Sequence, residues 1–346
     1  MKYPEGLKKN GTIGLVAPSF GCTFEPYISC MQAAIDRFDK MGYSIIEGPN
    51  CRKSDGIGIS STPKNCGGEL TEYYCKDDTD VLISCGGGEL MCEILDYVDF
   101  NAISNAKPKW FMGYSDNTNF TFLLNTICDT ASIYGPCVGA FGARELHPAL
   151  NDAISAIKGK LNRVTGYDMF ELESLKDEDN PLVPYNLTEE KELKLYIGDA
   201  EKSSLPVVEG RITGGCLDCL SNIVGTKYDK VSDFNAKYSD DGIIWFLEAC
   251  DLNVMSIRRS LWNLDRAGWF ENAKAFLIGR PLAAWKQEMM GLNQYNAVTG
   301  ILGKYNVPII MDADIGHLPP TMPIISGANA LISTSNDNIT IEYKYD

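Results

Sequence analysis

Ser115 stands at a predicted turn from a strand into a helix. The apolar run Trp110–Met112 reads as the end of a buried strand, it stops at Gly113, and apolar residues then recur at helical spacing. A sharp turn of this kind exposes the residue at its apex, as in a nucleophile elbow. The backbone N–H groups that open the helix would face a developing negative charge. The alternative is that Ser115 and Asp116 only cap the helix, since both are good cap residues.

Three consecutive glycines, Gly86, Gly87 and Gly88, follow the predicted strand Asp80–Ser84. Parallel sheets place their ligand crevice at such strand ends. A backbone without side chains can approach a substrate closely and offer N–H groups. Neither of the common glycine-rich phosphate-binding patterns is present, so we favour an oxyanion or substrate-binding turn over a nucleotide loop. An ordinary tight turn is the alternative.

A serine hydroxyl needs a base, and the chain contains two histidines. His147 precedes Pro148 at the start of a predicted helix, whereas His317 follows the buried strand Pro308–Met311. His317 is the better candidate because strand ends gather at the edge where a site forms. Glu248 ends another apolar strand and could orient the imidazole. The alternative for Glu248 is a solvated carboxylate at a strand end.

Charge and hydropathy exclude two classes of partner. The formal net charge is −15, and no lysine- or arginine-rich run is present, so we expect no binding to a nucleic acid polymer. No apolar stretch approaches the ~18 residues that span a bilayer, so we expect no membrane partner. The apolar part of 12–22 is short and interrupted by Gly14 and Pro18. We interpret it as a first strand rather than an export signal.

The twelve cysteines are predicted to be reduced and mostly buried, because disulfide frameworks belong to short secreted chains. Cys216 and Cys219 form one close pair, without a second pair at zinc-finger spacing. We therefore predict no metal site. A redox pair is the weaker alternative, since a thioredoxin-like context is missing from the sequence.

Strands and helices alternate along the first half of the chain, which predicts a parallel sheet with helices on both faces. The stretch Cys51–Gly68 is polar and rich in glycine and is predicted as a loop. The predicted strands are Thr12–Ala17, Tyr43–Ile46 and Asp80–Ser84, and the predicted helices are Ile28–Met41, Leu70–Cys75 and Leu90–Tyr97.

The composition becomes acidic and polar over 166–204, which we interpret as a linker. A second α/β pattern follows, and Ala330–Tyr345 alternates in the manner of antiparallel strands. We therefore predict an α/β protein of two domains. Residues 1–165 would form an N-terminal parallel-sheet sandwich with the nucleophile elbow. Residues 205–346 would form a C-terminal α/β domain with some antiparallel strands, carrying the glutamate and the histidine.

In combination, these motifs resemble the LD-carboxypeptidase and microcin C immunity serine peptidase family, which includes muramoyltetrapeptide carboxypeptidases. The matching residues follow the family order over nearly the whole chain. They are Ala17-Pro18-Ser19, Gly86–Gly88, Pro108-Lys109, Gly113–Thr118, Gly214-Gly215, Leu247-Glu248, Gly279-Arg280, and Gly316-His317 with Pro320 and Pro323.

The resemblance implies a catalytic triad with Ser115 as nucleophile, His317 as base and then acid, and Glu248 holding the imidazole. It implies an oxyanion hole from the N–H groups of Asp116 and a glycine of the triplet, with Gly87 the foremost candidate. It also implies hydrolysis of an amide through an acyl-enzyme, without metal or cofactor, by a cytoplasmic homodimer whose partner is a small peptide or peptidyl-nucleotide substrate.

Two departures from the family pattern leave the substrate open. Cys216 follows Gly214-Gly215 where the family often has asparagine, so a polar substrate contact is in doubt. Members that confer microcin immunity tend to carry a linker tryptophan for nucleobase stacking and an arginine shortly after the glutamate. Here the linker has no tryptophan, and Cys250-Asp251 stands near the glutamate. An LD-muropeptide and a microcin C-like peptidyl-nucleotide both remain candidate substrates.

Two rival interpretations use the same residues differently. Cys85 lies at a strand-turn position that is vaguely similar to the nucleophilic cysteine of glutamine amidotransferases, although no His-x-Glu follows near the end of the chain. The chain could instead be a non-catalytic two-domain protein that closes on a small ligand, with Ser115 contacting that ligand.

Overall fold

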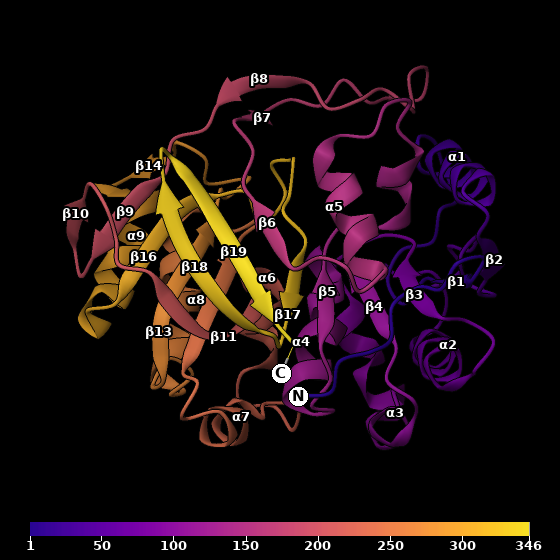
Figure 1. The fold of residues 1–346 in the computed structure, drawn as a ribbon, viewed down its shortest axis with the longest axis horizontal. Helices are drawn as coiled ribbons and strands as arrows, with labels where there is room; N and C mark the ends of the chain where they lie inside the picture. Colours follow the sequence, from indigo (N-terminus) through magenta and orange to yellow (C-terminus); the bar gives the residue numbers. More distant parts are fainter. Residues whose placement is uncertain (346) are drawn as a thin grey trace. The chain divides into compact units, whose positions relative to one another are not determined.

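The computed structural model describes residues 1–345. Contacts within the chain divide it into two compact units. Unit 1 comprises Met1–Leu161, Glu173–Asn186 and Pro323–Ile325, and unit 2 comprises the rest of the described chain. Each unit is built on one large sheet (Figure 1).

The sheet of unit 1 has six strands in the order β17-β5-β4-β3-β1-β2. The strands β1 to β5 pair in parallel. Every residue of β3, β4 and β5 is buried, as expected for strands covered on both faces. The strands are β1 Thr12–Val16, β2 Ser44–Glu47, β3 Val81–Ser84, β4 Trp110–Gly113, β5 Ser132–Tyr134 and β17 Ile324–Ser326.

Helices cover both faces of this sheet, and α1 and α2 lie on opposite sides of it in Figure 1. One face forms a core in which Leu82 and Phe111 of the strands pack with Leu70 of α2 and Phe120 of α4. The helices of unit 1 are α1 Tyr27–Lys40, α2 Pro63–Cys75, α3 Phe100–Asn105, α4 Thr118–Thr126 and α5 Pro148–Ile157, with the 3₁₀ segments η1 Met91–Tyr97, η2 Ser115–Asn117 and η3 Val138–Gly142.

Two local predictions for unit 1 are wrong. The stretch Cys51–Gly68 is not wholly a loop, because α2 already begins at Pro63. The Thr62 side chain accepts the N–H of Asn65, and proline at the first helical position needs no N–H partner, so the helix starts before its apolar residues do. The segment predicted as a helix at Leu90–Tyr97 is the 3₁₀ segment η1.

The sheet of unit 2 has nine strands in the order β10-β9-β16-β13-β12-β11-β18-β19-β6. Its four central strands are parallel, and the flanking strands are antiparallel. The strands are β6 Arg163–Thr165, β9 Lys194–Ile197, β10 Ala200–Lys202, β11 Val208–Cys216, β12 Ile243–Glu248, β13 Ala273–Gly279, β16 Pro308–Ala313, β18 Asn329–Ser335 and β19 Asn338–Lys344.

Helices α6, α8 and α9 pack in sequence beside this sheet. Two small sheets of two strands each complete the fold, β7 with β8 and β14 with β15. The remaining elements are α6 Leu217–Ile223, α7 Val231–Lys237, α8 Val254–Arg266, α9 Gln294–Leu302, η4 Gly303–Tyr305, β7 Met169–Glu171, β8 Leu187–Glu190, β14 Glu288–Met289 and β15 Leu292–Asn293.

The predicted α/β architecture, with a parallel first sheet and a second sheet that mixes parallel and antiparallel strands, is confirmed. The predicted linker 166–204 contains β7 to β10, and its residues are divided between the two units. The domain boundaries themselves stay a prediction. No helix within residues 1–345 combines the length and the apolar character that crossing a membrane requires.

Candidate active site

Ser115 directly follows the turn at the carboxyl end of β4, where η2 begins. Its φ of +61° lies in the left-handed region, which a residue with a side chain rarely adopts. Its N–H donates to the hydroxyl of the buried Tyr134 at 3.1 Å, which helps to hold this conformation. Strain at a turn between a strand and a helix is characteristic of functional sites. The local backbone therefore matches the predicted nucleophile elbow.

Asp116 fixes the turn from the inside. Only 2% of its surface is exposed, and its Oδ2 accepts the Ser19 hydroxyl at 2.6 Å and the Met91 N–H at 2.9 Å. Its Oδ1 accepts the amide of Asn119 at 3.0 Å. These bonds bring the ends of β1 and β4 together beneath Ser115. The side chain of Asp116 thus has a structural role, and its backbone N–H is the group that can serve the chemistry.

The glycine triplet lies beside Ser115 in the same unit. A Cβ added to Gly87 would lie 3.2 Å from Cβ and 3.3 Å from Oγ of Ser115. Glycine therefore keeps open the space in front of the hydroxyl. Phe20 donates its N–H to the carbonyl of Gly87 at 3.0 Å, and the Asn117 amide donates to the carbonyl of Gly86 at 2.9 Å. The carbonyls of Gly86 and Gly87 thus hold the glycine turn in place. In a trans peptide the N–H points away from the carbonyl, so the N–H groups of this turn point to the opposite side.

A different structural constraint requires glycine at position 88. The φ of Gly88 is +156°, and a Cβ there would lie 2.2 Å from the Ser19 Oγ and 3.1 Å from the Phe20 ring. Close packing of the β1 loop against the triplet accounts for Gly88. Of the three glycines, Gly87 is the one next to the serine.

Glu248 and His317 form a hydrogen-bonded pair in unit 2. The Nδ1 of His317 lies 2.9 Å from Oε2 of Glu248. Glu248 is the last residue of β12 and is 1% exposed, and the side chain of His317 is 11% exposed. Because Nδ1 faces the carboxylate, proton transfer to and from a reacting group would use Nε2.

Two glycines allow this close approach. A Cβ on Gly316, whose φ is +106°, would lie 2.7 Å from Oε2 of Glu248. A Cβ on Gly279, at the end of β13, would lie 2.1 Å from the carbonyl oxygen of Ile315 and 3.0 Å from Cβ of Glu248. The His317 loop can therefore pack directly on the glutamate only because neither position carries a side chain.

The electrostatics of the pair favour the imidazolium. Burial by itself lowers the pKa of His317, but the adjacent Glu248 charge and the hydrogen bonds to Glu248 and Cys250 raise that pKa well above its ordinary 6.5. Burial raises the pKa of the Cys250 thiol, while the contact with His317 opposes that rise. Glu248 thus stabilises the positive charge of the protonated imidazole.

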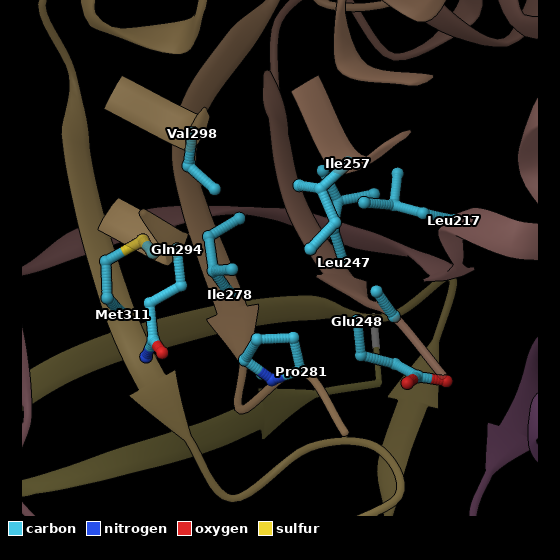
Figure 2. A pocket seen from close by; sticks show the side chains of 11 residues that line it. Leu217, Leu247, Glu248, Ile257, Ile278, Pro281, Gln294, Val298 and Met311 are labelled. Atoms are coloured by element: carbon cyan, nitrogen blue, oxygen red, sulfur yellow. The ribbon is translucent and has the colours of Figure 1, made fainter. Parts of the chain in front are cut away.

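A cavity lined mainly by apolar side chains lies behind Glu248. Figure 2 shows the carboxylate of Glu248 pointing away from the apolar side chains of Leu247, Ile257 and Val298. Apart from Glu248 and Gln294, the residues that line the cavity are apolar. They therefore provide a low-dielectric wall behind the carboxylate.

Two family models match the chain. The model of the LD-carboxypeptidase N-terminal domain matches residues 13–135, and that of the LD-carboxypeptidase C-terminal domain matches residues 209–332. The chain belongs to the LD-carboxypeptidase family. It is therefore related to peptidases, and both matched segments contain residues of the candidate site.

One curated relative of this family member is the microcin C7 self-immunity protein MccF of Escherichia coli, 27% identical over 90% of this chain and 87% of the relative. A structure of MccF with aspartyl sulfamoyl adenosine has a TM-score of 0.80, 23% identity, and covers 100% of this chain and 99% of that one. A structure of MccF with glutamyl sulfamoyl guanosine has a TM-score of 0.79, 23% identity, and covers 99% and 98%. At this identity, the structural likeness establishes the shared fold.

His147 and Cys85, the two other candidates from the sequence, both have structural roles in their surroundings. His147 accepts the N–H of Ala149 at 3.2 Å and caps α5. Hydrogen bonds with Cys22 and Cys51, together with burial, hold the pKa of the Cys85 thiol well above its ordinary value. A buried thiol of this kind is a poor nucleophile, which argues against Cys85 as the reactive group.

The cysteine pair of this family member marks the junction of β11 and α6. Cys216 is the last residue of β11, and Cys219 lies in the first turn of α6. Both are buried, and neither forms a disulfide. Cys216 pairs in register with Glu248 on the neighbouring strand. A cysteine thus occupies the strand end beside the glutamate.

Sequence reasoning assigned no role to three residues that support the serine turn. They are Ser19, whose hydroxyl binds Asp116, Tyr134, whose hydroxyl accepts the Ser115 N–H, and Asn117, whose amide binds Gly86. A usable signal was present for Ser19, since it stands two residues after the predicted first strand. Tyr134 carried no local signal, because only the pairing of β4 with β5 brings it to the serine.

Proposed function

We propose that this chain is a serine peptidase that hydrolyses an amide bond with Ser115, His317 and Glu248. The conformation of Ser115 carries the proposal. A residue with a side chain is held at a φ of +61° where a strand meets a helix, with Gly87 keeping the space at its hydroxyl open. The hydrogen-bonded Glu248–His317 pair and the family membership support it.

In the proposed mechanism, His317 acts as a base in its neutral form, which the raised pKa makes the minor form at neutral pH. Oγ of Ser115 attacks the substrate carbonyl while Nε2 of this neutral imidazole takes the hydroxyl proton. The oxyanion accepts hydrogen bonds from the N–H groups of Asp116 and Gly87. His317 then gives the proton to the leaving amine, and the amide C–N bond breaks to leave an ester on Ser115. Water attacks this ester with His317 as base, which releases the acid and restores the serine. Glu248 stabilises the imidazolium during both steps.

We propose a small substrate, either an LD-muropeptide or an aminoacyl or peptidyl-nucleotide amide. The family supports the first class, and the ligands in the MccF structures, aspartyl sulfamoyl adenosine and glutamyl sulfamoyl guanosine, support the second. Cys216 lies beside Glu248 at the position where the family resemblance implies asparagine, so we expect a polar substrate contact to be absent there. A cytoplasmic homodimer belongs to the same proposal and rests on family resemblance. Light scattering of the purified protein tests the dimer.

The deciding experiment is a paired hydrolysis assay read by mass spectrometry, with wild type, Ser115→Ala and the control Ser232→Ala. Ser232 is an exposed serine on α7, so its loss should leave hydrolysis unchanged. The two substrates are a tetrapeptide ending in D-alanine and aspartyl sulfamoyl adenosine. Release of D-alanine by wild type and the control, but not by Ser115→Ala, supports a cell-wall carboxypeptidase. Release of the sulfamoyl nucleoside supports the immunity activity.

Cleavage that survives Ser115→Ala contradicts the serine mechanism. Ligand binding without turnover of either substrate favours the alternative, a non-catalytic protein that holds a small ligand at the Ser115 turn. Removal of a catalytic serine is expected to lower kcat by at least about 10³-fold, so the two results are easily separated.

A further inference from the structure

Arg280 is a charged side chain enclosed in the core of unit 2. It follows β13 and is 1% exposed. Its Nη1 forms an ion pair with Oδ1 of the fully buried Asp314 at 2.7 Å. The guanidinium carbon lies 4.4 Å from the centre of the Phe170 ring. Burying two charges has a large desolvation cost, and well-packed apolar residues would often stabilise a core equally well. A contribution to stability alone therefore does not explain why Arg280 and Asp314 are buried in the core.

The same guanidinium binds the His317 loop on both sides of the histidine. Its Nη1 donates to the carbonyl of Asp312 at 3.0 Å, and its Nη2 donates to the carbonyl of Leu318 at 3.2 Å. Leu318 directly follows His317 in the chain. A planar group with several donors can span a loop in this way, whereas the single ammonium of lysine cannot reproduce the geometry.

Asp314 is itself held from two other segments. Its Oδ2 accepts the Lys191 ammonium at 3.1 Å and the Tyr167 N–H at 2.7 Å. Lys191 also donates to the side chain of Asn338 at 2.8 Å. A Cβ on Gly166 would lie 2.5 Å from Oδ2 of Asp314, so this approach requires a glycine. The carboxylate that orients Arg280 is thus immobilised by residues far away in the sequence.

A second buried arginine of unit 2 provides a comparison. Arg211 is 6% exposed and forms an ion pair with Asp241. It donates to the carbonyl of Gly327 at 2.6 Å and lies 3.9 Å from the Tyr238 ring centre. These partners lie outside the His317 loop. Arg211 therefore matches Arg280 in burial, ion pairing and ring contact, but it does not share the hydrogen bonds of Arg280 to the His317 loop.

We propose that Arg280 is a positioning residue for the His317–Glu248 pair. It clamps the loop from Asp312 to Leu318 so that Nδ1 of His317 stays at hydrogen-bonding distance from Glu248. The preceding residue, Gly279, abuts Glu248 itself, so one short segment contacts both members of the pair. The catalytic part of this inference rests on the proposed function, but the geometric part does not.

The test follows the imidazole of His317 by NMR pH titration in a His147→Asn background, where it is the remaining histidine. In this background, Arg280→Lys should move the pKa of His317 back toward 6.5, because a loosened loop weakens its contact with Glu248. Arg211→Lys should leave that pKa unchanged. The titratable groups that face His317 are Glu248 and Cys250, and those that face Arg280 are Asp312 and Asp314. None of these side chains is altered by Arg280→Lys.

On a substrate that wild type hydrolyses, Arg280→Lys should lower kcat by about 10- to 100-fold with little change in KM, as expected when a base is misplaced. An unchanged His317 pKa in Arg280→Lys, or an equal change in Arg211→Lys, overturns the inference. If Arg280→Lys does not fold, Asp314→Asn replaces it with the same criteria. The titration needs no substrate. A protein that hydrolyses neither substrate but shows the shift therefore contradicts the proposed function and leaves the positioning role standing.

Discussion

His317 approaches Glu248 to 2.9 Å across 69 residues of sequence, and Gly316 is one of the two glycines that make this distance possible. A side chain at position 316 would collide with the carboxylate, since even a Cβ would lie 2.7 Å from Oε2. The pair is enclosed at the carboxyl ends of the central parallel strands. This environment strengthens the interaction between the two groups and sets the protonation of the histidine.

Glu248→Gln should lower the pKa of His317. Burial disfavours the imidazolium, and the substitution removes the negative charge that chiefly counteracts this effect. If the triad operates as proposed, kcat should fall by about 10³- to 10⁴-fold. The raised pKa also stabilises the fold below pH 6.5, and this contribution is lost as the pH rises through the folded-state value. NMR titration in the His147→Asn background measures the pKa directly. An imidazole that titrates identically in both proteins would contradict the assignment.

Gly87→Ala should lower kcat by about 10²- to 10³-fold, because the added methyl group would occupy the space at the Ser115 hydroxyl and disturb an oxyanion donor. Gly68→Ala in α2 is the matched control, since a Cβ there meets nothing within 4 Å. The control should keep full activity and raise the free energy of unfolding by about 0.5–1 kcal/mol. Steady-state kinetics and urea denaturation measure both effects. Full activity in Gly87→Ala would remove Gly87 from the site.

Ser115→Gly and Ser115→Ala both remove the hydroxyl but differ in backbone freedom. Alanine keeps the strain of a positive φ and glycine does not, so Ser115→Gly should have the higher free energy of unfolding, by about 1 kcal/mol. Urea denaturation of the two variants gives the difference. An equal or reversed order of stability would show that the turn is not strained in solution.

Asp312 should make the protein less stable as the pH rises. Burial, only partly opposed by hydrogen bonds from Tyr295 and Gln294 and by the charge of Arg280, raises its pKa from 3.8 to about 6. The folded state therefore binds the proton more tightly than the unfolded state. The resulting stabilisation is complete below pH 4 and is lost as the pH rises through 6, a difference of about 3 kcal/mol.

Asp312→Asn tests this assignment, since asparagine is neutral and tolerates the φ of +63° at this position. Urea denaturation between pH 4 and pH 8 should give a stability difference, variant minus wild type, that increases through pH 6. A difference that does not change with pH would mean that Asp312 titrates normally.

Sequence patterns were sufficient for the buried parallel strands and for the candidate residues at their ends. Strands such as β3, β4 and β12 are wholly buried, so their apolar runs are unmistakable. Edge strands were missed for the opposite reason. All three residues of β10 are exposed, and β8 alternates between half-buried and exposed, so the stretch 166–204 reads as polar linker although it contains strands.

The candidate site was predictable in its members but not in its supports. Strand ends and glycines pointed to Ser115, the glycine triplet, Glu248 and His317, and family resemblance suggested their roles, which stay a prediction. The structure adds Tyr134, whose hydroxyl reaches the serine from the next strand, and Arg280, whose guanidinium holds the His317 loop. The sequence could not assign a role to Tyr134 or Arg280. The groups they bind near the site are backbone N–H and carbonyl groups, which leave no pattern in a sequence.

The sequence by itself determined the order of strands and turns and the chemical groups at the strand ends, because hydrophobic periodicity and glycine turns are local properties. Tertiary structure alone decided that Ser19 bonds Asp116 across 97 residues and that Arg280 bonds Leu318 across 38. It also decided that Glu248 is buried against His317 rather than solvated. These outcomes depend on which strands become neighbours and on the exclusion of water between them, and both are properties of the packed chain.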